Sequence, residues 1–189
     1  MAARRDTRGM FAAKLEEMTE SQPLSKVRVS DLCWECDVER RVFYYHFKDK
    51  YDLVAWMFVR DYLSGASGTT SFSQELYIEM HRSLWERREF YRRALQEDTH
   101  HAIERHLVRH GIESNERALK RYLRKPTLSP EMTVLIRHFV HGDVGCLVEW
   151  IRGEFEATPE QLASNLFSCV PPALRDAYAE WTSRSHLGQ

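Results

Sequence analysis

Side-chain types that suit contact with duplex DNA are concentrated in one short stretch of this sequence. Arginine can bind guanine through two parallel hydrogen bonds, and Tyr, His and Lys side chains donate to phosphate oxygens. These types occur together at Arg40, Arg41, Tyr44, Tyr45, His46, Lys48 and Lys50. Lys50 also falls in the first turn of a predicted helix, whose free N–H groups favour a nearby anion. The pattern predicts a DNA contact surface, with arginines at base edges and the other donors at phosphates.

The charge of the whole chain does not by itself favour nucleic acid as a partner. Lys and Arg number 27 and Asp and Glu number 28, for a net charge of -1. DNA binding must therefore come from a local basic patch. Residues 38–50 contain four Lys or Arg residues and two acidic ones, Glu39 and Asp49, for a net charge of +2. This surface is less basic than expected, which predicts binding that is weak or depends on a few contacts, unless Glu39 accepts from a cytosine amino group.

Three short helices are predicted to position these side chains, over residues 6–21, 29–36 and 39–46. Asp37 marks the turn between the second and third helices, because Asp tolerates a left-handed backbone better than most residues. The core side of the unit is formed by Val38, Phe43 and Phe47. Three helices of this size within 50 residues are typical of a helix-turn-helix unit, whose second short helix lies in the major groove.

The rest of the chain is also predicted to be helical, so the fold class is all-α. Asp49 caps a helix over 50–63 that is apolar nearly all round, as expected of a helix packed on several sides. Residues 64–71 are rich in Ser, Gly and Thr and read as a connection between domains. Further helices are predicted over 72–87, 89–96, 99–124 and 130–152, and from 159 onward. Gly111 is expected to weaken the third of these, and Pro171-Pro172 to interrupt or end the last.

The stretch from Val38 to Leu53 resembles the signature of the TetR/AcrR family of bacterial regulators, in which a Phe-Tyr-x-His-Phe core precedes a Lys and an apolar helix. The opening of the second helix, at Val27, Val29, Asp31 and Leu32, is also similar. The stretches 87–91 and 139–166 resemble the C-terminal region of a subgroup that includes regulators of dihydroxyacetone kinase operons. The resemblance implies a helix-turn-helix DNA-binding domain over 1–50 and a C-terminal regulatory and dimerisation domain over 51–189.

By position, the resemblance implies that Tyr44 and His46 are a phosphate-binding pair and that Lys50 binds phosphate. It places Arg40, Arg41 and Tyr45 toward the groove. The sequence departs from the family pattern at four positions. Asp37 stands where Gly is common, Glu39 where Ser is frequent, Val42 where Thr is frequent, and Arg28 where a Thr cap is usual.

The resemblance further implies a repressor that binds a palindromic operator as a homodimer and is released by a small effector. Candidates to line the effector pocket are Trp85, Tyr91, Tyr122, Phe139 and Trp150, although such residues are more often simply core. The last two long helices would form the dimer interface, with contacts at Leu147, Ile151, Leu162 and Leu166. Gly142 and Gly145 would permit close helix approach. In an alternative, a protein partner controls the regulator and the C-terminal domain holds no cavity.

Two spacings invite an enzymatic or metal-binding interpretation. Cys33 and Cys36 have CxxC spacing, and His106 and His110 share a helix face. No second ligand pair or strand-to-helix context accompanies them, so packing of the thiols and a solvated polar helix are the favoured interpretations. No nucleophile–base arrangement is legible. The sequence predicts no enzyme, cofactor or metal.

The chain is expected to be cytoplasmic. It has no apolar run of about 18 residues that would span a membrane. Its N-terminus lacks the long apolar stretch of a secretory signal. Four cysteines do not form a disulfide framework for a chain of 189 residues, which favours a reducing compartment.

Overall fold

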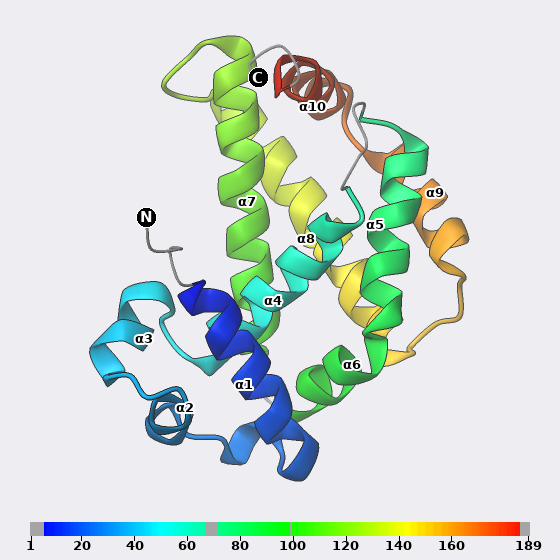
Figure 1. The fold of residues 1–189 in the computed structure, drawn as a ribbon. Coiled ribbons are helices and arrows are strands. Elements are labelled where there is room, and N and C mark those ends of the chain that lie inside the picture. Colours follow the sequence, from blue (N-terminus) through cyan, green and yellow to red (C-terminus); the bar gives the residue numbers. More distant parts are fainter. Residues whose placement is uncertain (1–5, 67–71, 99, 186–189) are drawn as a thin grey trace.

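The computed structural model describes residues 6–66, 72–98 and 100–185, and within these ranges every regular element is helical (Figure 1). The all-α prediction is therefore confirmed. The elements are α1 (Thr7–Ser21), the 3-10 helix η1 (Leu24–Lys26), α2 (Val29–Glu35), α3 (Arg40–His46), α4 (Lys50–Ser64), α5 (Gln74–Glu86), α6 (Arg88–Glu97), α7 (Ala102–Leu123), α8 (Pro130–Arg152), α9 (Pro159–Cys169) and α10 (Pro172–Ser185).

Local capping explains where most helices begin. Side chains at the N-cap position accept a hydrogen bond from the first turn of α1, α4, α5, α8 and α9 and so satisfy one of its free N–H groups. At α9 the Thr158 side chain binds the N–H of Gln161, and the Gln161 side chain returns a bond to the Thr158 N–H. This is a complete capping box. Gly153, with φ 81°, ends α8 in the left-handed region that glycine favours.

The first three helices form a small unit around an aromatic core. Phe11 of α1 meets Phe43 of α3 edge to face at 5.2 Å, and Phe47 lies 5.6 Å from Phe43. All three rings are buried. Helix α4 leads from this unit into the larger group of helices, where it packs against α5 and α7 (Figure 1).

The larger group is built on the long antiparallel pair α7 and α8. Helix α10 packs against α7, α9 against α5, and α6 against α8 and η1. The sequence predicted that Gly111 would weaken this helix, yet α7 runs without a break through Gly111. A Cβ at Gly111 would lie 2.7 Å from Cγ1 of Val140. The glycine therefore allows α7 and α8 to approach closely, and this packing offsets its low helix propensity.

Two further boundaries differ from, or sharpen, the sequence interpretation. The η1 turn was not predicted, because its three residues show no periodicity that would mark it. Pro171-Pro172 separates two helices, since α9 ends at Cys169 and α10 begins at Pro172. Most of the predicted 64–71 connection lies outside the described residues, although Ser64 is still part of α4.

Candidate nucleic-acid interface and adjoining sites

The turn before α3 sets the direction of that helix. Asp37 adopts φ 52°, the left-handed conformation expected at this turn. The next N–H, of Val38, donates to the Cys33 carbonyl over 3.0 Å and closes the turn against α2. Phe43 is fully buried on the inner side of α3, so the opposite side of the helix faces solvent. Turn and anchor together fix which side chains α3 presents.

The outer face of α3 presents the side chains that the sequence analysis selected. Arg40 and Arg41 are exposed, and Tyr44 and Tyr45 expose 57% and 85% of their surface. Exposure of large aromatic side chains to this extent costs apolar burial, which is usual where a partner covers them. Lys48, just beyond α3, is also exposed. These residues share one accessible surface.

Arg41 and Glu39 neutralise each other on this surface. The Arg41 Nε lies 3.0 Å from the Glu39 carboxylate, and a second guanidinium nitrogen donates to it over 3.3 Å. Glu39 is the N-cap of α3, but its side chain makes no capping bond. The acidic residue that stands where the family often has Ser is thus held by Arg41. Within the part of the chain that the structure describes, Arg40 forms no ion pair, and its exposed guanidinium remains available to a duplex.

His46, the last residue of α3, is half-buried. Burial, with a smaller effect of the nearby Arg8, lowers the pKa of His46. The imidazole is therefore neutral near pH 7. Any phosphate contact it makes is a hydrogen bond from a neutral ring.

Lys50 has a different role from the predicted one. Its Nζ donates to the backbone carbonyls of Leu24, Ser25 and Val27 over 2.7, 2.9 and 2.9 Å. An ammonium group has three hydrogens, so all of its donors are used. Lys50 does border a shallow depression of about 350 Å³ that Arg40, Tyr44 and Ser30 also line. Lys50 therefore stabilises the η1 turn. It has no free N–H to donate to a phosphate, which was the role predicted for it.

Two residues of α2 were not predicted as contact candidates: Ser30, which borders this surface, and Trp34, which is exposed elsewhere on the helix. Ser30 lines the same depression as Arg40 and Tyr44. Trp34, at the other end of α2, exposes 84% of its surface. The Ser30 hydroxyl in the first turn of a helix was a signal that could have been read. Trp34 gave none, since its position on the helix indicates packing as readily as exposure.

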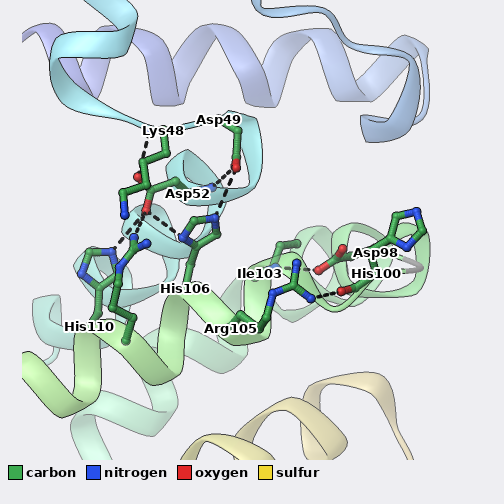
Figure 2. A network of polar contacts seen from close by, with 10 residues as sticks. Lys48, Asp49, Asp52, Asp98, His100, Ile103, Arg105, His106 and His110 are labelled. Atoms are coloured by element: carbon green, nitrogen blue, oxygen red, sulfur yellow. Dashed lines mark hydrogen bonds and ion pairs between the residues drawn. The ribbon is translucent and has the colours of Figure 1, made fainter.

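The N-terminus of α4 carries a buried polar junction with α7 (Figure 2). Asp52 is 6% exposed, and its carboxylate accepts from the Lys48 N–H over 3.0 Å and from Arg109 over 2.8 Å. His106 Nδ1 and His110 Nε2 lie 3.3 and 3.5 Å from Oδ1, the oxygen that accepts from Arg109. Burial alone would raise the pKa of Asp52. The Lys48 hydrogen bond and the three α7 side chains hold it below its ordinary value.

This junction corrects the sequence interpretation of the two histidines. Neither is on a solvated face, because both turn toward Asp52, and His106 Nε2 also lies 3.4 Å from Asp49 (Figure 2). Among the described residues, no group of three or more His, Cys, Asp or Glu side chains is arranged to hold a metal. The histidines thus join the start of α4, just after the first three helices, to α7.

The thiols of the CxxC spacing pack as predicted. Cys33 is buried, and Cys36 packs half-buried against the same core. Burial raises the pKa of both thiols, which makes them poor nucleophiles.

A cavity of about 300 Å³ lies between α4, α5, α7, α8 and α10. Of the five candidates for a pocket lining, only Phe139 borders it. Trp85 stacks on the buried Trp150 at 4.5 Å, and Tyr91 is buried with its hydroxyl 2.5 Å from Asp61. Tyr122 packs against the core away from the cavity. None of these four residues lines the cavity, so they pack within the protein and do not face a ligand space.

The candidates for dimer contact are also placed differently from the prediction. Leu147, Ile151, Leu162 and Leu166 are between 2% and 8% exposed within a single copy of the chain. They fill the protomer's own core and have little surface left for a second copy. The outward side of α8 instead carries Val134, 65% exposed, and Gly142 and Gly145, where an added Cβ would meet nothing within 4 Å.

Within the described residues, no helix combines the length and apolar character needed to cross a membrane.

Comparisons with known proteins agree with these features. None of the curated proteins matches the chain. The solved structure of the dihydroxyacetone kinase operon activator DhaS has the same fold, with a TM-score of 0.52 over 87% of this chain and 93% of that chain, at 17% identity. Residues 73–171, more than half of the chain, match the TetR-type family model described as a transcriptional regulator C-terminal region. The chain therefore belongs to the TetR family of transcriptional regulators.

Proposed function

We propose that two copies of this regulator bind a palindromic operator through α3 and that a small effector in the C-terminal cavity releases them. The observation that carries the proposal is the outer face of α3. There Arg40, Tyr44 and Tyr45 are exposed together on a helix that the buried Phe43 holds in place. A helix-turn-helix unit lays this helix in the major groove, and dimers bind half-sites about 34 Å apart or at a multiple of that.

The contacts divide by chemistry. Arg40 is the residue best placed for a base edge, and Arg41 can join it once its pair with Glu39 opens. Tyr44, Tyr45, His46 and Lys48 would donate to phosphates and fix the register without reading sequence. Lys50 stabilises the backbone around η1 through its three hydrogen bonds and makes no DNA contact in this assignment.

Two regions with different tasks follow from this assignment: residues 1–50 for DNA and residues 51–189 for regulation and dimerisation. The polar junction at Asp52 lies just after this boundary. A change in the packing of α7 against α4 would therefore alter the orientation of the DNA-contact unit.

A second copy would cover the outward side of α8. Val134 is largely exposed there, and Gly142 and Gly145 leave room for a helix to approach closely. Small residues at a helix surface permit such close contact. The two-fold axis of the dimer would then match the symmetry of a palindromic operator.

The cavity supports control by a small effector. Its walls include α4 residues and His110 of α7, and His110 also lies 3.5 Å from Asp52. An effector acts only through its different affinity for the two arrangements of α4 and α7; a coupling of about 1–3 kcal/mol is usual. An alternative is a regulator or coactivator controlled by a protein partner. The similar protein DhaS is an operon activator, so an activating role belongs to this alternative. A cavity within the ordinary size of ligand sites favours the effector.

The test is a binding selection on random duplexes, followed by fluorescence anisotropy on the selected site. Arg40→Ala should weaken binding by about tenfold or more and relax the preference at one base pair. Tyr44→Ala should weaken binding to all sequences alike. Arg121→Ala on the exposed end of α7 removes the same charge far from α3 and serves as the matched control. Failure to select any sequence, or equal affinities for all three variants, would refute DNA binding by this face.

A further inference from the structure

Among the described residues that line the cavity, one acidic side chain has an oxygen without a hydrogen-bond partner. The carboxylate of Asp143, on α8, borders the cavity, and its Oδ1 is closed off from solvent without a hydrogen bond. The residue as a whole is half-buried. Among the described residues, no Lys, Arg or His forms an ion pair with it. Burial raises the pKa of Asp143 to about 7.

An unpartnered buried acceptor is uncommon and destabilising, because folding removes its water without replacing the hydrogen bond. Neighbouring groups do not supply that bond. The Asn115 amide donates to the Gly111 carbonyl, and its oxygen accepts from the Tyr178 hydroxyl. The space beside Asp143 is the cavity itself. The missing partner can therefore come from a molecule that enters the cavity.

The other ionisable groups that face the cavity are neutral near pH 7. From α4, α5 and α10 these are Tyr62, Tyr77 and Tyr178, and burial raises the pKa of each, to about 12 for Tyr178. From α7 it is His110, whose pKa is lowered by burial. Among the described residues that line the cavity, none is Lys or Arg. The cavity therefore offers one site for a negative charge and no fixed positive charge.

The remaining wall suits a cation with an apolar body. Phe72 stacks on Tyr178 at 5.1 Å and meets Tyr77 edge to face at 5.6 Å, and Tyr62 and Phe139 border the same space. The faces of aromatic rings attract cations, most strongly when the cation is removed from water. The apolar side chains bury the rest of such a ligand.

We propose that the cavity binds a small organic monocation, an ammonium group on an apolar or aromatic body, with its charge paired to Asp143. This inference rests on the proposed effector role of the same cavity and names the class of effector. Anionic ligands are disfavoured because they would meet a carboxyl group and no cation.

The test compares two probes of the same shape on the full chain by isothermal titration calorimetry. Benzyltrimethylammonium carries the charge, and neopentylbenzene replaces its nitrogen by carbon. At pH 8 the cation should bind at least about tenfold more tightly. Its affinity should fall by up to tenfold per pH unit below pH 7, where a proton competes for Asp143, while the affinity of neopentylbenzene stays constant.

Asp143→Asn should remove the preference for the cation and its pH dependence, with neopentylbenzene still bound. Glu149→Gln, which removes an exposed carboxylate from the same helix, is the matched control and should change neither. Equal binding of both probes, binding of neither, or a cation preference that survives in Asp143→Asn would overturn the inference.

Operator affinity measured with each probe separates this inference from the proposed function. A cation that binds through Asp143 without changing operator affinity supports the inference and contradicts the effector role. Release of the operator by neopentylbenzene alone supports the effector role and contradicts the inference.

Discussion

Arg109 of α7 donates a 2.8 Å hydrogen bond to the buried carboxylate of Asp52, which lies in the first turn of α4. This contact joins the start of α4, just after the first three helices, to α7, one of the helices that enclose the cavity. The same carboxylate accepts from the Lys48 N–H, so one side chain holds the start of α4 from two directions.

Asp52→Ala is expected to lower the free energy of unfolding by about 2–4 kcal/mol, because it leaves the part-buried Lys48 N–H and the Arg109 guanidinium without their acceptor. Urea denaturation followed by circular dichroism measures the change. Glu113→Ala, at an exposed position of α7, is the control and should change stability by about 0.5 kcal/mol or less. A loss at Asp52 no larger than this would contradict the role assigned to the junction.

Lys50→Met should lower the free energy of unfolding while changing the affinity for the operator only slightly. The ammonium group binds three carbonyls, and the substitution leaves them without that donor. We expect a loss of about 1–3 kcal/mol in the free energy of unfolding. Operator affinity, measured where both proteins are fully folded, should fall much less than for Arg40→Ala. Native stability with a large loss of affinity would restore Lys50 as a phosphate ligand.

Asp37→Gly should stabilise the chain. Asp37 has φ 52°, where a Cβ costs energy and glycine does not. We expect a gain of about 0.5–1 kcal/mol, measured as a higher midpoint in thermal unfolding. Asp31→Gly, in the first turn of α2, should instead destabilise. If the two substitutions had the same sign, backbone strain at Asp37 would be disproved.

Gly145→Arg should weaken the dimer without harming the protomer. An added side chain at Gly145 meets nothing within 4 Å in one copy, and arginine favours helix over glycine. Sedimentation velocity should show a shift toward monomer, and binding of the palindromic site should fall while half-site binding is kept. Thr127→Arg, before α8, adds the same charge elsewhere. An unchanged dimer would exclude this side of α8 as the interface.

Asp143 should make stability depend on pH. Its folded pKa of about 7 lies above the ordinary 3.8, so the folded chain holds a proton that the unfolded chain has released between these values. Stability is therefore lost as pH rises from about 4 to about 7, and the loss is complete above 7. Asp143→Asn should be more stable than the native chain at pH 8, by about 1–3 kcal/mol, and about equal to it at pH 4. Urea titrations at both pH values test this, and an equal difference at both would contradict it.

The α3 surface could be predicted from sequence because local rules determine it. Phe43 and Phe47 lie four residues apart and bury one side of the helix, which leaves Arg40, Tyr44 and Tyr45 on the other. The caps at Asp49 and Thr158 were legible for the same reason, since each acts within four residues.

The cavity and the junction could not be predicted in this way. Asp143 and Tyr62 are far apart in the sequence and meet only after α4, α7 and α8 have packed. Residue type alone pointed to Trp85 and Trp150, which stack on each other. Likewise, nothing near Lys50 in the sequence reveals that three carbonyls about 25 residues away take up its hydrogens.

The exposure of Trp34 gives the regulator a spectroscopic contrast of its own. Its indole is open to water on α2, whereas Trp150 is sealed inside the protein and donates to the Ala157 carbonyl. Iodide in solution should collide with the first and not with the second. The quenching that is lost in Trp34→Phe thus monitors the surroundings of the helix-turn-helix unit without a dye.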